Sequence, residues 1–188
     1  MKLYIFDFDG TITSLDSFIL FSYRSVSTTS FLKFYITSLP LFLFLPKKKI
    51  KERFFKSFVN TRLKSFNRIC DSFSKNHLSK FIKKSFIDYI SFLDPQSKVV
   101  IVSASISNYL EPWCKMMAFD LISTELEVKN GKLTGRFSTP NCNGIEKVIR
   151  IQEKYKLSDY DEIHVFGNTK GDFPMLELGT HKYFKFFK

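Results

Sequence analysis

Short apolar runs that are typical of buried strands recur along this chain, and helical patterns separate them. The apolar runs cover residues 2–6, 98–105, 120–124 and 162–168, and 182–187 is expected as an edge strand. Apolar residues at helical spacing predict helices over 107–119 and 144–157, and a further helix begins in GDFPMLELG and can stop at Gly179. Strands that alternate with helices predict parallel crossovers. We therefore expect an α/β fold with a mostly parallel open sheet covered on both faces.

Two segments depart from this alternation. Residues 125–137 alternate apolar and polar residues around Asn130-Gly131, which is the preferred pair for a tight hairpin turn. Residues 14–97 contain apolar residues at mixed helical spacing and no convincing strand, and KKKIKERFFKSF is expected to begin a basic helix. We expect a helical insertion that stands over the strand ends.

The positive charge of the chain is concentrated in this insertion. Residues 14–98 hold 16 Lys and Arg against 5 Asp and Glu, whereas the rest of the chain holds 13 of each. One explanation is a genome biased toward Lys, Phe, Ile, Ser and Asn, but such a bias would not confine the net charge to one region. The other explanation is a basic surface that attracts anionic substrates, anionic lipid or nucleic acid.

Length and cysteine content indicate the class of protein. A chain of 188 residues with 44% hydrophobic content can bury one good core. Its three cysteines, Cys70, Cys114 and Cys142, have unrelated spacings, so we expect free thiols rather than a disulfide framework or a zinc site. The N-terminal apolar run is broken by Asp7 and has no cleavage pattern of a signal peptide. The sequence predicts a cytoplasmic protein.

The apolar stretch at 31–46 raises the question of a membrane segment. It is shorter than the roughly 20 residues of a transmembrane helix, and Lys33 and Pro40 interrupt it. The favoured interpretation is a buried helical hairpin. The alternative is an interfacial segment whose following lysines contact anionic headgroups at the inner face of the membrane; these are Lys47, Lys48, Lys49 and Lys51.

Polar side chains follow the predicted strands at the points where the strands end. Asp7 and Asp9 follow the first strand, and two like charges one residue apart in a strand disfavour each other's ionisation. A hairpin turn at Asp-Gly is one explanation, and a divalent cation that bridges the carboxylates to a phosphate is another. In open α/β sheets, ligands bind beyond the carboxyl ends of the strands, where these residues should converge. The other strand-end residues are Ser103, Ser105, Asn168 and Asp172.

Four ordered motifs resemble those of the haloacid dehalogenase superfamily. They are DFDGT at 7–11, VSAS at 102–105, GIEKV with Lys147, and GNTKGD at 167–172. The pattern is most similar to the phosphoserine-phosphatase-like branch, and the stretches YLEPWC, LEVKNGKLTGRF and TPNCNGIEK look closer to members related to phosphatidylglycerophosphatase C. The resemblance implies a Rossmann-like three-layer core over 1–13 and 98–188 and an inserted helical cap over 14–97.

The resemblance also implies roles for individual residues. Asp7 would be the nucleophile that forms an aspartyl-phosphate, and Asp9 would be the general acid and base. Ser103 and Lys147 would bind phosphate, although a strand-end serine and an exposed helix lysine are common without such roles. The implied cofactor is Mg²⁺, with Asp7, Asp9, Asn168 and Asp172 as its ligands.

Two positions need comment. Many phosphatases of this type have Asp where this chain has Asn168; an amide oxygen can still bind magnesium, but the loss of one negative charge predicts weaker binding. Asp16 lies where serine-specific members have an acidic residue that meets the substrate ammonium, and an exposed Asp at the cap hinge is the alternative. We assign no role to His77, His164 or His181.

The sequence therefore predicts a magnesium-dependent phosphatase that acts on a phosphate monoester. Because the predicted cap is basic and rich in Phe, we favour a lipid or another bulky anionic phosphate over phosphoserine or another small metabolite. The competing class is a catalytically impaired protein that binds a membrane surface or nucleic acid. Asp7 and Asp9 argue against this class, since a binder of anions has no use for two carboxylates one residue apart, and nucleic acid is the less favoured partner.

Overall fold

The computed structural model describes the backbone of residues 1–188 and all side chains except those of Phe42 and Lys47. Its main sheet has five strands in the order β3-β2-β1-β6-β7, and all of their pairings are parallel. The strands are β1 (Lys2–Asp7), β2 (Lys98–Ile106), β3 (Asp120–Thr124), β6 (Glu162–Gly167) and β7 (His181–Phe184). The expected α/β class with a mostly parallel, Rossmann-like sheet is confirmed.

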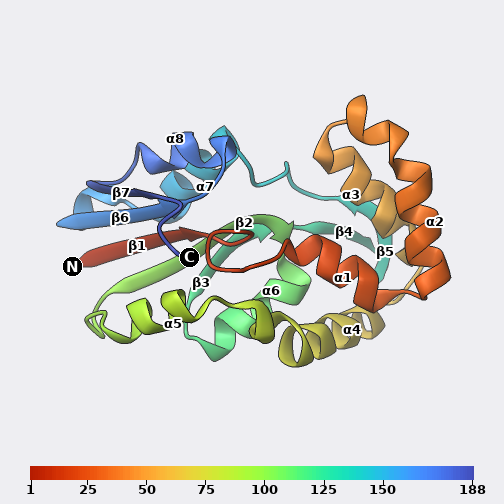
Figure 1. Ribbon diagram of the computed structural model, residues 1–188, viewed down its shortest axis with the longest axis horizontal. Coiled ribbons are helices and arrows are strands. Elements are labelled where there is room, and N and C mark those ends of the chain that lie inside the picture. Colours follow the sequence, from red (N-terminus) through yellow and green to blue (C-terminus); the bar gives the residue numbers. More distant parts are fainter.

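Helices cover both faces of this sheet (Figure 1). Helices α7 (Ile145–Lys154) and α8 (Phe173–Leu176) lie on one face, and α5 (Lys84–Ser91) and α6 (Ser107–Met116) lie on the other. One apolar cluster lies between the sheet and the helices on each face, because the strand side chains alternate between the two sides. Short 3₁₀ turns complete this part of the chain; they are η4 (Leu157–Asp159) and η5 (Lys170–Asp172).

The predicted hairpin forms a second, two-stranded sheet. Strands β4 (Leu126–Lys129) and β5 (Lys132–Phe137) are antiparallel, and both Asn130 and Gly131 have positive φ at the turn between them. The hairpin pairs with the insertion: Asn60 N donates to Leu133 O at 3.0 Å. At Gly135 a Cβ would lie 2.9 Å from the Lys56 Cα, so a glycine allows this close approach.

Between β1 and β2 the chain is helical, as predicted. The helices are α1 (Ser17–Ser25), α2 (Thr28–Ser38), α3 (Lys47–Phe55) and α4 (Leu63–Asn76), followed by α5, and 3₁₀ turns occur at η1 (Pro40–Leu43), η2 (Lys56–Phe58) and η3 (Leu78–Phe81). Helices α1 to α4 lie beyond the carboxyl ends of the strands (Figure 1). Phenylalanines fill the space among them; Phe21 contacts Phe55, Phe66 and Phe73 with ring centroids 5.2–6.3 Å apart.

The chain enters and leaves α1 to α4 at one place. Residues 12–14 lie beside 81–83, with a bridge between Thr13 and Ile82 and a hydrogen bond from Ser14 N to Phe81 O at 2.9 Å. Helix α5 comes after this point and packs on the sheet, where the Phe86 ring lies 5.2 Å from the Phe6 ring. Helix α5 thus packs with the sheet, whereas our prediction places it in the cap range 14–97. The division of the chain into core and cap remains a prediction.

The prediction of a buried helical hairpin at 31–46 is wrong. The segment is helical, but the side chains of Ile36, Leu39, Leu43 and Phe44 are 70–81% exposed. Helix α2 packs inward only through its other side, where the Phe34 ring lies 5.3 Å from the Phe54 ring. Because rings from α1, α3 and α4 already occupy the core of the insertion, the aliphatic side of α2 faces outward. Among the described residues, no helix has the length and apolar character needed to cross a bilayer.

Candidate active site

Four of the six strand-end residues, Asp7, Asp9, Asn168 and Asp172, converge on one cavity of about 330 Å³ between the sheet and α3. It is bounded by the loops after β1 and β6, by the end of β2 and by the start of α7. Three lysines and four aspartates line it, so the protein itself brings more negative than positive charge to this cavity. The lining residues include Asp7, Asp9, Asp16, Lys48, Lys51, Asn141, Asn143, Lys147, Asn168, Thr169 and Asp172.

Asp7 is the last residue of β1 and is almost completely buried. Its Oδ1 accepts a hydrogen bond from Lys147 Nζ at 2.6 Å, and its Oδ2 accepts one from Thr11 Oγ1 at 2.7 Å. Burial raises the pKa of Asp7 to about 6, although Lys147 and Thr11 both favour its carboxylate form. The side chain is therefore fixed in orientation and retains a proton more readily than an exposed aspartate.

Lys147 lies in the first turn of α7 and is 1% exposed. Its ammonium lies between two carboxylates, 2.6 Å from Asp7 Oδ1 and 2.7 Å from Asp172 Oδ1. Burial alone would lower the pKa of Lys147, but the two carboxylates raise it above its ordinary value. The lysine thus remains a cation at the floor of the cavity.

Asp172 is held by more donors than Lys147 alone. Its Oδ2 accepts hydrogen bonds from Asn168 N, from Thr169 N and from Thr169 Oγ1 at 2.9–3.1 Å. Burial would raise the pKa of Asp172, but Lys147 and the two donors of Thr169 lower it below its ordinary value. Asp172 therefore positions Lys147 and the loop after β6, a role the sequence did not indicate; its predicted role as a magnesium ligand remains a prediction.

Asp9 is oriented by two elements that are distant in sequence. Ser17 N at the start of α1 donates to Asp9 Oδ1 at 2.6 Å, and Ser105 Oγ at the end of β2 donates to Asp9 Oδ2 at 2.7 Å. The two serine hydroxyls are 3.0 Å apart. Asp9 is thereby held at the junction between the sheet and the insertion.

The remaining predicted residues have different placements. Ser103 is fully buried below the cavity, where its Oγ accepts a hydrogen bond from Ser105 N at 3.0 Å, and its neighbour Ala104 lines the cavity instead. Asp16 lines the cavity and caps α1, since its Oδ1 accepts hydrogen bonds from Phe18 N and Ile19 N. The structure brings every residue with a predicted catalytic or binding role except Ser103 to the cavity wall, and the strand-end residue Ser105 also lies outside that wall.

Asn168 supplies an observation that bears on a metal. Its Oδ1 is buried and has no hydrogen-bond partner, which is costly unless a cation or another donor is bound there. Gly10 permits this placement, because a Cβ at that position, where φ is +76°, would lie 2.2 Å from Asn168 Nδ2. Together with the nearby aspartates, the site offers only oxygen donors, and this donor set fits Mg²⁺.

The sequence did not single out several residues of this site. Thr11, Ser17 and Thr169 position the aspartates through hydrogen bonds. Thr11 and Thr169 lie within two of the quoted motifs but had no assigned role, and no motif contains Ser17. Ser105 was visible as a strand-end residue but had no assigned partner. The asparagines Asn141 and Asn143 also line the cavity, and the Oδ1 of Asn141 is a second buried oxygen without a partner.

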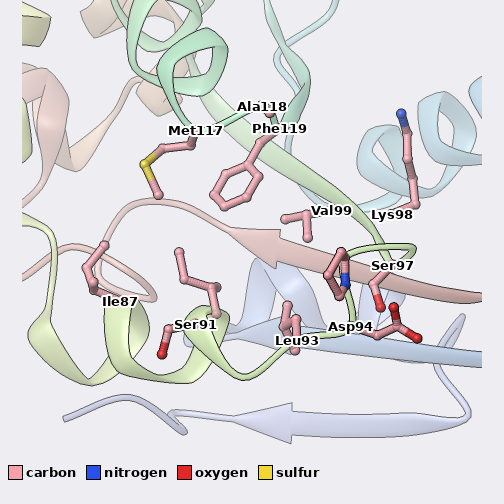
Figure 2. A pocket seen from close by; sticks show the side chains of 12 residues that line it. Ile87, Ser91, Leu93, Asp94, Ser97, Lys98, Val99, Met117, Ala118 and Phe119 are labelled. Carbon is pink, nitrogen blue, oxygen red and sulfur yellow. The ribbon is translucent and has the colours of Figure 1, made fainter.

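A larger cavity of about 570 Å³ lies elsewhere, between α5, the loop before β2 and the end of α6. Figure 2 shows Met117 and Phe119 on one side of it and Ile87 on the other. It is at the amino ends of the strands, and none of the predicted site residues lines it. The chemistry predicted from the sequence therefore belongs to the smaller cavity.

Comparison with known proteins decides the family. The model of the family described as "haloacid dehalogenase-like hydrolase" matches residues 4–177 of this chain. The chain belongs to this family. It is 28% identical over 193 aligned residues to Protein CicA of Caulobacter vibrioides, an alignment that covers 99% of this chain and 86% of that protein.

Solved structures of other proteins share the fold. A protein from Bordetella pertussis Tohama I is similar with a TM-score of 0.83 and 19% identity, over 95% of this chain and 87% of that one. A phosphoserine phosphatase with a phospho-aspartyl intermediate analogue is similar with a TM-score of 0.63 and 14% identity, over 95% and 83% of the two chains. The resemblance to phosphoserine-phosphatase-like members is confirmed at the level of the fold. The narrower resemblance to phosphatidylglycerophosphatase C remains a prediction.

Proposed function

We propose that this haloacid dehalogenase-like hydrolase is a magnesium-dependent phosphatase that cleaves phosphate monoesters through an aspartyl-phosphate on Asp7. The single observation that carries the proposal is the buried Asp7–Lys147 pair at the floor of the cavity, 2.6 Å apart. A carboxylate that attacks a dianionic phosphate needs a neighbouring cation, and a buried lysine provides one without competition from solvent.

The two aspartates after β1 would divide the chemistry between them. Asp7 would attack phosphorus, since Thr11 and Lys147 fix its carboxylate in one orientation. Asp9 would protonate the leaving oxygen and then deprotonate the water that hydrolyses the aspartyl-phosphate. Its carboxylate is positioned for this by Ser17 and Ser105.

The proposed magnesium site consists of oxygen ligands from the loops after β1 and β6. Asp7, Asp9, Asn168 and Asp172 would hold the ion, and the unpartnered Oδ1 of Asn168 supports this assignment. Bound Mg²⁺ would neutralise the phosphate and fix its orientation. Lys147 would bind a phosphate oxygen from the opposite side. Ser103 would join it only if its buried hydroxyl reached the phosphate.

A lipid or another bulky anionic phosphate is the substrate class that we favour. Lys48 and Lys51 of α3 line the cavity, so part of the basic charge of the insertion faces the site. The segment just before α3 exposes large apolar side chains, which is unusual for a soluble surface. Cationic and apolar groups together suit a phosphate on an apolar carrier, and they support peripheral contact with an anionic membrane.

The exposed apolar side chains form one stripe. Leu32, Ile36 and Leu39 follow one another at spacings of four and three residues along α2 and its C-cap, which places them on one helical face, and Leu43 continues the stripe in the 3₁₀ turn η1. Their side chains are 51–81% exposed. No Asp or Glu occurs from 17 to 51, so an anionic surface would meet no like charge from this segment.

Phosphoserine is the alternative substrate, because phosphoserine phosphatases are among the structures that share the fold. Asp16 would then meet the substrate ammonium from the cavity wall. The competing class is a binding protein for an anionic surface that has lost catalysis at Asn168. The intact arrangement of Asp7, Asp9 and Lys147 favours an enzyme, and the four aspartates that line the cavity disfavour nucleic acid.

The test is hydrolysis of an aryl phosphate with and without magnesium. We expect turnover to require Mg²⁺ and to disappear in Asp7→Asn, because an amide is a poor nucleophile. Asp9→Asn should lose less activity on an aryl phosphate than on an alkyl phosphate, since only the alkyl leaving group needs a proton. Full activity in Asp7→Asn would refute the assignment of Asp7 as the nucleophile. Salt-sensitive lipid binding without any turnover would favour the binding-protein class.

A further inference from the structure

Three side chains of the types that bind transition metals meet at the edge of the sheet, away from the cavity. Glu162 and His164 are two residues apart on β6, so their side chains share a face. His181 opens β7 and is the register partner of His164. One carboxylate oxygen and one nitrogen from each histidine all lie within 4.8 Å of one another.

The distances among these atoms are close to those of a metal site. Glu162 Oε2 lies 2.8 Å from His164 Nε2 and 3.9 Å from His181 Nε2. Ligands of tetrahedral Zn²⁺ at about 2.0–2.1 Å from the ion stand roughly 3.3 Å apart, so displacements of about an ångström would bring these atoms to that spacing. The His181 ring, which is stacked on the His164 ring at an angle of 16°, would also have to turn so that its nitrogen lone pair points at the ion. His181 and Glu162 are partly exposed and can make such rotations.

We propose that Glu162, His164 and His181 bind a divalent transition-metal ion, with Zn²⁺ as the best candidate. Two imidazoles and one carboxylate on a strand pair form an N₂O donor set, which suits Zn²⁺, Ni²⁺ or Cu²⁺ and disfavours Mg²⁺. The proposed magnesium site has only oxygen donors, so the two sites differ in the ions they select. A water molecule would complete the coordination of the zinc.

Neighbouring residues support the orientation of His164. Its ring is stacked between the Tyr4 and His181 rings at centroid distances of 4.6 and 4.5 Å. Its Nδ1 lies 3.3 Å from the Tyr183 hydroxyl, which leaves Nε2 directed at Glu162. A metal-binding histidine commonly has its other ring nitrogen fixed by such a hydrogen bond.

Lys2 opposes the metal. Its Nζ lies 2.9 Å from Glu162 Oε2, the same oxygen that both histidines approach. A bound cation would compete with this ammonium for the oxygen, and the partly exposed lysine would have to move toward solvent. The proposal therefore predicts that removal of the Lys2 charge strengthens metal binding. If the cluster holds only ion pairs and no metal, removal of this charge should not strengthen metal binding.

The position of the site indicates a structural effect. Glu162 begins β6 and Asn168 follows its end, so the proposed zinc and magnesium sites lie roughly 15–20 Å apart along one strand. Strand β7 is the edge of the sheet and has only four residues. A metal that joins β6 to β7 would stabilise this edge without taking part in phosphate chemistry.

Calorimetric titration of the full chain with Zn²⁺ tests the proposal, with the Asp7→Asn variant as a background that weakens ion binding in the cavity. We expect about one equivalent of Zn²⁺ in both backgrounds. His181→Ala and Glu162→Gln should each weaken the affinity at least ten-fold, and His77→Ala, which changes a histidine of the insertion, should leave it unchanged. Unaltered affinity in His181→Ala, or loss of the zinc site in Asp7→Asn alone, would overturn the proposal.

Two further variants separate metal ligation from a merely structural cluster. Lys2→Met should tighten Zn²⁺ binding, and Tyr183→Phe should weaken it about ten-fold with the three ligands intact. The midpoint of thermal unfolding should rise with Zn²⁺ in the wild-type chain and not in His181→Ala. Weaker binding in Lys2→Met, or the same zinc-dependent shift in His181→Ala, would show that the cluster does not hold the ion. Because these readouts need no turnover, they are independent of the proposed phosphatase activity.

Discussion

Lys51 on α3 donates a hydrogen bond of 3.0 Å from its Nζ to the carbonyl oxygen of Ala104 at the end of β2. Both residues line the candidate active site, and they come from the helical insertion and from the sheet. The same ammonium lies 5.5 Å from the centre of the Phe18 ring on α1. A cation of the insertion is thereby fixed against the sheet, directly at the cavity.

This contact predicts that Lys51 contributes to substrate binding. We expect Lys51→Met to raise KM for a phosphate monoester about three- to ten-fold with a smaller effect on kcat, because a partly exposed charge interaction contributes about 1 kcal/mol. Steady-state kinetics on an aryl phosphate measure both constants. Lys49→Met is the matched control: Lys49 is on the same helix, but its ammonium pairs with Glu52 at 3.6 Å and its side chain is outside the cavity wall. Equal effects of both changes would show that only the net charge matters.

The Asn168→Asp variant should differ from the wild-type chain in the Mg²⁺ concentration that its activity requires. Replacement by Asp would put a carboxylate where the buried Oδ1 now has no partner. The Mg²⁺ concentration for half-maximal activity should fall, roughly ten-fold if the carboxylate contributes about 1.4 kcal/mol. The control is Asn143→Asp, which adds the same charge at another position of the cavity wall. If only the control shifts the magnesium dependence, Asn168 does not contact the ion.

The raised pKa of Asp7 predicts how the stability of the metal-free protein depends on pH. Burial raises this pKa to about 6, whereas an unfolded aspartate has a pKa of about 3.9. The folded state therefore holds the proton up to a higher pH, and the contribution of Asp7 to stability is lost as pH rises through about 6. Between pH 5 and 7 the free energy of unfolding should fall by about 1 kcal/mol from this group.

Urea unfolding in a chelator at pH 5 and pH 7 measures this difference. Asp7→Asn has no titrating group at this position, so its stability should fall less over the same interval. The difference between the two proteins cancels the titration of groups elsewhere in the chain. An identical pH dependence in both would mean that Asp7 titrates near its ordinary pKa in the folded protein.

The sequence predicted the sheet well because its strands are local patterns. Apolar runs such as 2–6 and the Asn130-Gly131 turn specify their own conformation, and the structure confirms both. The residues that position Asp9 could not be found in this way. Ser17 and Ser105 reach Asp9 from 8 and 96 residues away, and only the packed sheet and insertion bring them together.

The exposed stripe shows a second limit of the sequence. Apolar residues at helical spacing predict a helix with one apolar face, but the spacing is the same whether that face is covered or open. The interior of the insertion was filled by rings such as Phe21, Phe54 and Phe55, and no local pattern around 31–46 reveals this. The prediction of a buried hairpin therefore had the right secondary structure and the wrong burial.

The stripe leads to the last prediction, which concerns the substrate. If α2 and η1 contact an anionic membrane, Ile36→Ser with Leu43→Ser should reduce turnover of phosphatidylglycerol phosphate in mixed micelles several-fold, because each change removes an exposed apolar side chain. Hydrolysis of an aryl phosphate should stay nearly unchanged, since neither residue lines the cavity. Phe92→Ser is the control, as Phe92 is 87% exposed and follows α5 rather than α2.

A side-by-side assay of phosphoserine completes this prediction. We expect the lipid phosphate to be the better substrate, with a preference that weakens as salt screens the lysines of α3. Pure electrostatic attraction would favour every anionic phosphate alike, so the apolar variants and the salt series together separate charge from apolar contact. If phosphoserine is turned over faster, or if the double variant slows both substrates equally, the stripe does not select a lipid. A small-metabolite phosphatase would then remain, with the same chemistry at Asp7.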